Sequence, residues 1–364
     1  MPTNKLRMAI RATAAMTVLG LASQAQAFEV QAGDVKADIY GYARLTATYD
    51  INEKITGDDS TLAGDFGMIS DSDNEGHFDA SATQSRIGVS TMLPQDVKVV
   101  IEGDFASGGN FRLRHAFGEY KGILAGQTWS NFSSFTGNTP TLDFNGAAGW
   151  AGYQARTAQL RYTTGGLSVS VEDPKGSVSA GTKKDASPAF TARYEGSSDA
   201  MAFSAAALVK QTAYDNSDTG GEDDSTLGFG VFGAANFKVS ESFSIQGNVV
   251  YTDGANGYLY LSGAPDGYVD ANNDLETISG LGASLGTSFA LGGGRSVNLV
   301  YGMTQMDVDN ATDEETRSNI LANYMWTPVK NVMMGVEYQY WKTETKGGNS
   351  EDANRLMLAA QYNF

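Results

Sequence analysis

Arginines alternate with apolar residues in several segments of the sequence. In "FRLRHAF" (111–117), Phe111, Leu113 and Phe117 are expected to face one way, which turns Arg112 and Arg114 the other way. A guanidinium stays charged and binds a carboxylate through two parallel hydrogen bonds, so a row of arginines could attract anions. The same alternation predicts further charged side chains on that inner face: Arg44, Arg86, Arg161, Arg193, Lys98, Glu102 and Asp104.

Only His77 and His115 could act as histidine bases. His77 lies in an acidic stretch, and the alternation predicts that His115 faces outward with its apolar neighbours. Neither belongs to a recognisable serine–histidine motif, so we expect no enzyme activity and no cofactor.

"DSDNEG" (71–76) begins like a calcium loop, but position twelve is Ala82 instead of glutamate, which favours a solvated acidic loop over a metal site.

The elements that would hold these side chains are strands with a period of two. Residues 36–50 alternate throughout, and an arginine on the lipid side of such a strand would cost about 2–4 kcal/mol near the membrane midplane. The sequence predicts sixteen strands. They lie near residues 36–50, 80–92, 97–106, 110–121, 122–130, 156–164, 167–173, 188–196, 200–212, 226–238, 242–253, 277–290, 295–308, 317–327, 331–344 and 354–364.

The connections between these segments alternate in length. Those after even-numbered strands are brief, such as "GG" at 165–166, whereas most of those after odd-numbered strands are longer and acidic, such as 51–79. Tight turns at one end and long loops at the other, with an even strand number, are typical of bacterial outer-membrane barrels. The sequence therefore predicts an all-β, transmembrane antiparallel β-barrel of sixteen strands. A β-sandwich would not explain the loop asymmetry.

The N-terminus carries the pattern of an export signal. Three basic residues precede the apolar run "ATAAMTVLGLA", and Ala25–Ala27 offers a small-x-small cleavage site. We expect residues 1–27 to be a signal peptide and residues 28–364 to form one barrel domain.

The chain has no cysteine, and its net charge of −17 argues against nucleic acid as a partner.

Residues 131–155 form an unusual long connection. The segment carries Phe132, Phe135, Phe144 and Trp150 with a single acid, Asp143, whereas neighbouring loops are rich in carboxylates. Aromatic loops avoid water, so we expect this segment to fold into the barrel and narrow it. An aromatic contact surface on the outside is the alternative.

Two stretches resemble the early hairpins of trimeric Gram-negative porins: "QSRIGVSTMLPQDVKVVIEGDF" (84–105) and "FRLRHAFGEYKGILAGQTWS" (111–130). The second is closer to the DcaP-like porin family, whose members are associated with uptake of small anions such as dicarboxylates. The resemblance implies that Arg86 and Arg156 belong to the pore wall and that Asp143 is the acid of the inward loop. Gln127 stands where general porins have an arginine. The terminal alternation ending in Tyr362 and Phe364 also resembles the signal read by the outer-membrane assembly machinery.

The expected function is that of an outer-membrane porin for passive diffusion of small hydrophilic solutes, with a preference for anions such as (di)carboxylates. The alternative is a barrel that does not transport and serves as an adhesin, phage receptor or envelope scaffold. Expected partners are small anionic solutes, outer-membrane lipid and lipopolysaccharide. We also expect a homotrimer, because Gly41, Ala43, Ala47 and His115 are predicted on one outward face, where a neighbouring subunit could approach closely.

Overall fold

The computed structural model describes residues 28–33, 35–55, 61–66, 75–179, 182–215, 224–270, 272–307, 315–345, 348 and 350–364. The expected signal peptide, residues 1–27, lies outside these residues, as does most of the acidic stretch 71–76. In the part of the chain that is described, no helix is long and apolar enough to cross a membrane.

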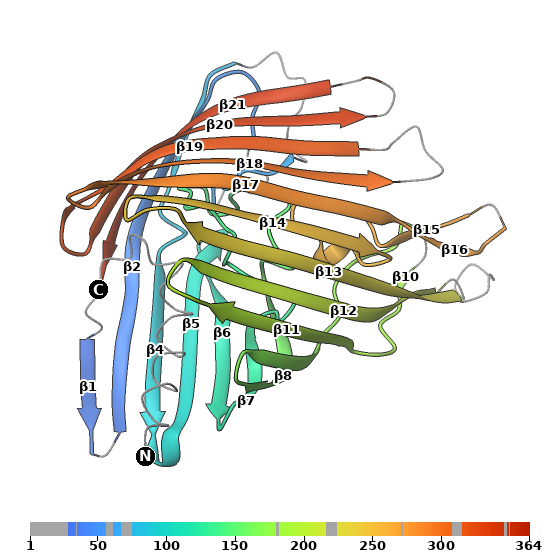
Figure 1. Ribbon diagram of the computed structural model, residues 1–364, viewed down its shortest axis with the longest axis horizontal. Coiled ribbons are helices and arrows are strands. Elements are labelled where there is room, and N and C mark those ends of the chain that lie inside the picture. The colour runs from blue at the N-terminus through green and yellow to red at the C-terminus, as the bar shows by residue number, and fades with distance from the viewer. Residues whose placement is uncertain are drawn as a thin grey trace.

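The described residues form a closed antiparallel barrel of sixteen strands, as predicted (Figure 1). The first and last strands close it, since β2 pairs with β21 from Tyr42↔Asn363 to Asp50↔Arg355. The wall strands, with β3 and β4 forming one interrupted strand, are β2 (Val35–Asp50), β3 (His77–Ser81), β4 (Arg86–Leu93), β5 (Val97–Ser107), β6 (Asn110–Tyr120), β7 (Ile123–Trp129), β8 (Arg156–Thr164), β9 (Leu167–Glu172), β11 (Ala189–Ser197), β12 (Met201–Asp215), β13 (Asp224–Lys238), β14 (Phe243–Asp253), β17 (Ser279–Gly292), β18 (Arg295–Asp307), β19 (Glu315–Val329), β20 (Val332–Thr345) and β21 (Ser350–Asn363).

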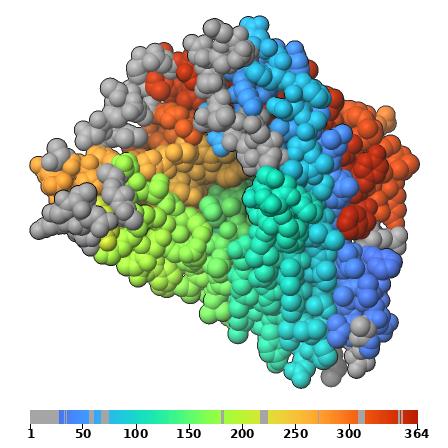
Figure 2. Space-filling view, turned by 180° about the vertical axis from the view of Figure 1, so that it is seen from behind, coloured from blue at the N-terminus to red at the C-terminus, as the bar shows by residue number. Residues whose placement is uncertain are grey.

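Short elements lie beside this wall. They are β1 (Phe28–Ala32), which pairs with the start of β2, β10 (Thr182–Lys183), the hairpin β15 (Gly267–Val269) and β16 (Leu275–Thr277), and the 3-10 turns η2 (Pro94–Asp96) and η4 (Asn256–Tyr258). Figure 2 shows the blue N-terminal strands lying against the red C-terminal ones, where the barrel closes. At this seam the backbones of Gly41 and Phe364 exchange two hydrogen bonds, of 3.1 and 3.0 Å.

Apolar side chains cover the outside of the wall. On β21, Leu356 and Leu358 are 43% and 55% exposed, whereas Arg355 and Met357, which alternate with them, are fully buried. Tyr362 and Phe364 are also exposed, at 57% and 42%. This is the inside-out pattern of a strand that has lipid on one face and a polar interior on the other.

Two predicted orientations on β6 are wrong because the strand contains a bulge. Leu113 of β6 pairs with Gly103 of β5, and His115 pairs with the adjacent residue Glu102. Arg114, between Leu113 and His115, therefore has no residue opposite it on β5. Beyond the bulge the faces exchange, and His115 and Phe117 lie on the inner face instead of the outer one. His115 Nδ1 lies 3.0 Å from Thr128 Oγ1. His115 therefore offers no support for a subunit contact.

The long connection between β7 and β8, named here L3 (residues 130–155), folds into the barrel as predicted. Phe132 is fully buried in a core cluster with Phe232, Val250 and Tyr258, the last from the connection between β14 and β17, named here L6 (residues 254–278). Trp150 of L3 stacks on Tyr260 of L6, with ring centroids 6.1 Å apart and planes 7° from parallel. This burial excludes the alternative of an external aromatic surface.

Candidate functional site: the arginine wall and loop L3

Three of the predicted arginines converge on the two predicted carboxylates of β5. Arg112 binds Asp104 through both carboxylate oxygens, each at 2.9 Å. Arg114 bridges the two acids, at 2.8 Å to Glu102 and 2.9 Å to Asp104. Arg86 Nε lies 3.3 Å from Glu102. These five residues, named here the β4–β6 charge cluster, carry three positive and two negative charges.

Arg156, at the start of β8, has a different environment. Its guanidinium carbon lies 4.6 Å from the centre of the Trp129 ring, and that of Arg114 lies 5.9 Å from the same ring. Trp129 is itself held edge-on by Phe135 of L3, with centroids 4.9 Å apart. Within the described residues no hydrogen bond or ion pair joins Arg156 to a carboxylate. An aromatic ring therefore holds Arg156 beside the β4–β6 charge cluster, and four guanidiniums there face two acids.

Three other predicted arginines bind backbone carbonyls of L3 or of the strand before it. Arg44, which is buried, donates to the carbonyl of Leu142 at 2.5 Å. Arg193 donates to the carbonyl of Ser133 and lies 3.2 Å from Glu195. The third, Arg161, donates to the carbonyl of Trp129 at 2.6 Å. These guanidiniums position L3 on the wall.

Asp143, the predicted acid of the loop, is buried and fully engaged. Its Oδ2 accepts hydrogen bonds from the backbone N–H of Gly64, at 2.9 Å, and from Gln339 Nε2, at 3.1 Å. Its Oδ1 accepts the N–H of Asn145 at 2.8 Å. Asp143 thus ties L3 to β20 and to the connection after β2.

The remaining predicted residues lie away from the centre of the cluster. Gln127 donates to the carbonyls of Leu113 and Arg114 at the β6 bulge, at 3.3 and 3.2 Å. It lies on the other face of β7 from the buried Thr128. Lys98 is opposite Glu119 in the register, one residue from the start of β5.

Glu337 on β20 anchors the middle of L3 and was not among the predicted site residues. Its carboxylate is fully buried and accepts the N–H groups of Leu142 and Asp143, at 2.7 and 3.0 Å. Asn323 and Gln339 donate to the same carboxylate, at 3.0 and 2.8 Å. Alternation could have identified Glu337, because it lies between the outward-facing Val336 and Tyr338.

Glu172, at the end of β9, holds the start of L3 in a similar way. Its carboxylate accepts the hydroxyl of Ser130 and the N–H of Asn131, both at 2.6 Å. Carboxylates at the start and in the middle of L3, together with Arg193 and Arg44, therefore fix this loop against the inner wall.

Comparisons with known proteins agree with this architecture. The crystal structure of the outer membrane channel DcaP of Acinetobacter baumannii matches with a TM-score of 0.82 and 31% sequence identity, covering 93% of this chain and 99% of that chain. OmpT of Vibrio cholerae matches with a TM-score of 0.60 at 12% identity, covering 93% of this chain and 100% of that one. The anion-selective porin from Comamonas acidovorans matches with a TM-score of 0.58 at 11% identity, covering 91% of this chain and 100% of that one.

The last two likenesses show the fold alone, and no curated protein sequence matches the chain. The family model described as DcaP outer membrane protein matches residues 21–364, which include every strand of the barrel. The expected resemblance and the expected location in the bacterial outer membrane are thereby confirmed. The chain belongs to the DcaP outer membrane protein family.

Proposed function

We propose that this outer-membrane protein lets small hydrophilic solutes diffuse passively through its barrel, with a preference for anions such as carboxylates and dicarboxylates. The observation that carries the proposal is the excess of guanidiniums at the inner wall: Arg86, Arg112, Arg114 and Arg156 against Glu102 and Asp104. We propose a channel and no enzyme, in keeping with the relative from Acinetobacter baumannii, which is described as a channel.

Local charge has more influence here than the charge of the whole chain. The chain carries a net charge of −17, but many of its acids lie in long loops. Their effect on the lumen falls off over a Debye length of about 8 Å at physiological salt. A narrow passage with walls of low dielectric concentrates the field of the charges that line it. An excess of positive charge at the wall therefore favours anions despite the acidic loops.

We also propose a homotrimer embedded in outer-membrane lipid and lipopolysaccharide, and removal of residues 1–27 during export. Exposed apolar side chains on neighbouring strands, among them Leu45, Ile87 and Ile101, support an outer face that meets lipid or another subunit. One solved form of OmpT of Vibrio cholerae is a trimer. Gly41 no longer supports the trimer, because the ring of Phe364 covers it.

The zero-current potential of reconstituted channels across a potassium chloride gradient tests the anion preference. We expect the wild type to favour chloride and Arg156→Gln to reduce that preference, since three guanidiniums would then face two acids. Arg295→Gln is the matched control, because Arg295 is exposed at the start of β18, next to the tight turn that follows Gly292. A cation-selective wild type, or equal effects of the two variants, would contradict the proposal. A barrel with no conductance would favour the adhesin, phage receptor or scaffold alternative.

A further inference from the structure

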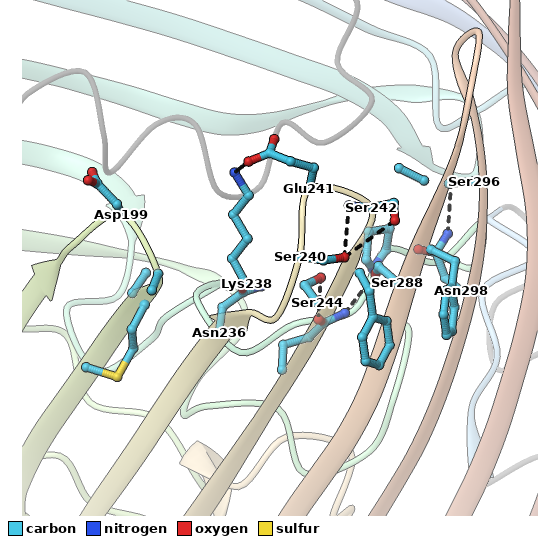
Figure 3. Close-up of a pocket in the computed structure, with 18 of the residues that line it drawn as sticks. Asp199, Asn236, Lys238, Ser240, Glu241, Ser242, Ser244, Ser288, Ser296 and Asn298 are labelled. Carbon is cyan, nitrogen blue, oxygen red and sulfur yellow. Dashed lines mark hydrogen bonds and ion pairs between the residues drawn. The ribbon is translucent and has the colours of Figure 1, made fainter.

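A cavity of about 610 Å³ lies between L3 and the end of the barrel that carries the tight turns (Figure 3). Its walls come from β12, β13, β14, β17 and β18. Asn138 and Pro140 of L3 line it on one side, and the turns at 198–200 and 239–242 form its rim. Because tight turns face the periplasm in outer-membrane barrels, the cavity is a chamber on the periplasmic side of L3.

The wall of this chamber is uncharged and combines polar side chains with apolar ones such as Met201, Phe243 and Phe289. Of the lining residues only Asp199, Lys238 and Glu241 are charged, and they lie in or directly beside the turns of the rim. Lys238 and Glu241 pair with each other at 3.1 Å. The polar groups of the wall are hydroxyls and carboxamides, from Asn236, Ser244, Gln246, Ser288, Ser296 and Asn298. Its chemistry is thus unlike that of the β4–β6 charge cluster.

These groups form a row across neighbouring strands. Ser244 on β14 is opposite Ser288 on β17, and Ser288 is opposite Asn298 on β18. Asn298 is in turn opposite Asn323 on β19. Side chains that face each other across an antiparallel pair stand about 4.5–5.5 Å apart. The row therefore offers hydrogen-bonding groups at a regular spacing along one surface.

Hydrogen bonds to neighbouring side chains use the amide protons of Asn298 and Gln246. Asn298 Nδ2 donates to Asn323 Oδ1 at 2.8 Å and to Ser296 Oγ at 3.3 Å. Gln246 Nε2 donates to Ser288 Oγ at 2.9 Å. Among the described residues, Asn298 Oδ1 and the hydroxyl protons of Ser288 and Ser296 have no partner. An acceptor and donors therefore remain free side by side, and none of them carries charge.

We propose that this chamber binds neutral, hydroxyl-rich solutes of sugar size. Each hydroxyl of such a solute can both donate and accept, which matches the free groups of the row. An anion would need only hydrogen-bond donors from the wall, and a cation would need only acceptors. The proposal does not depend on the anion preference, because it concerns a separate set of residues on another part of the wall.

The test measures block of ion current by maltose added on the tight-turn side of single channels in potassium chloride. Polyethylene glycol of similar mass serves as the control for simple filling of the pore. We expect a saturable block by maltose beyond that of the polymer. Ser288→Ala should raise the half-blocking concentration about fivefold, the effect of losing one hydrogen bond. Ser318→Ala, on the outer face of β19, should leave it unchanged.

Asn298→Leu is a second variant that removes the free acceptor. Both variants should keep the wild-type zero-current potential, which separates this proposal from the anion preference and shows that the channel has folded. Equal block by maltose and the polymer would overturn the proposal. An unchanged half-blocking concentration in both variants would overturn it as well, since maltose would then bind elsewhere.

Discussion

Replacing Glu337 with glutamine should loosen the middle of L3 while the barrel stays closed. Each carboxylate oxygen of Glu337 accepts two hydrogen bonds: Oε2 from Leu142 N and Asn323 Nδ2, and Oε1 from Asp143 N and Gln339 Nε2. A glutamine has one acceptor oxygen, so two of the four bonds are lost and its NH₂ group faces two donors. Hydrogen bonds to a charged group contribute about 1.5–3 kcal/mol each, so the local loss is about 3–6 kcal/mol.

The rest of L3 keeps its attachments in this variant. Asn319 still receives the N–H of Ala148 at 3.0 Å, and Asn248 still donates to the carbonyl of Gly137 at 3.1 Å. We therefore expect only the segment 140–146 to become mobile. Single-channel recording should show a higher mean conductance and more current noise than in the wild type, and limited proteolysis should cut within 140–146.

Glu344→Gln is the matched control, because it makes the same chemical change on the same strand. Glu344 is half exposed and pairs with Lys342 at 2.7 Å, away from L3. Wild-type conductance and noise in Glu337→Gln would refute the reasoning. Equal changes in the two variants would also refute it, since the effect would then come from loss of any negative charge on β20.

Three further variants test other contacts. Asp104→Asn removes the acid that neutralises Arg112, so the ratio of chloride to potassium permeability should rise in the zero-current assay, and a fall would contradict the charge count. Asp266→Asn leaves Lys210 buried without its acid, so L6 should become more sensitive to protease, at a cost of about 3–5 kcal/mol if the lysine stays charged. Unchanged cleavage would show that this ion pair does not hold L6. Deleting Phe364 should lower the yield of heat-modifiable barrel in the outer membrane, because two backbone hydrogen bonds at the seam are lost. A normal yield would count against an assembly signal at this residue.

The wall of the barrel could be predicted from the sequence because one physical rule acts on every strand. Lipid outside and a polar interior impose a period of two, and the tight turns at one end keep neighbouring strands antiparallel. The rule fails at a β-bulge, where one strand has an extra residue relative to its neighbour and the two faces exchange beyond it. The bulge at Arg114 adds one residue to β6, and no feature of "RLRHAFG" marks it, so His115 and Phe117 were assigned to the wrong face.

The candidate site could be predicted only in part, because alternation says which face a residue occupies but not which residue it meets. Arg112 and Arg44 share the same pattern in sequence. In the structure one binds a carboxylate and the other a backbone carbonyl. The partner depends on the register between strands and on the path of L3, which crosses to β20 because of contacts such as that between Glu337 and Leu142. These contacts join residues almost two hundred positions apart.

The number of arginines in the wall is therefore a poor measure of the charge that a solute meets. Arg112 and Arg114 lie against carboxylates, so removing either leaves a buried acid unpaired and disturbs the packing of the wall as well as lowering its charge. Removing Arg44 would loosen L3 as well as change the electrostatic field of the lumen, because its guanidinium donates a hydrogen bond to the carbonyl of Leu142. Arg156 has an aromatic ring as its support, so its loss removes a full charge with no acid left behind. Among single arginine variants of this wall, Arg156→Gln should cause the largest fall in anion preference relative to any change in conductance noise.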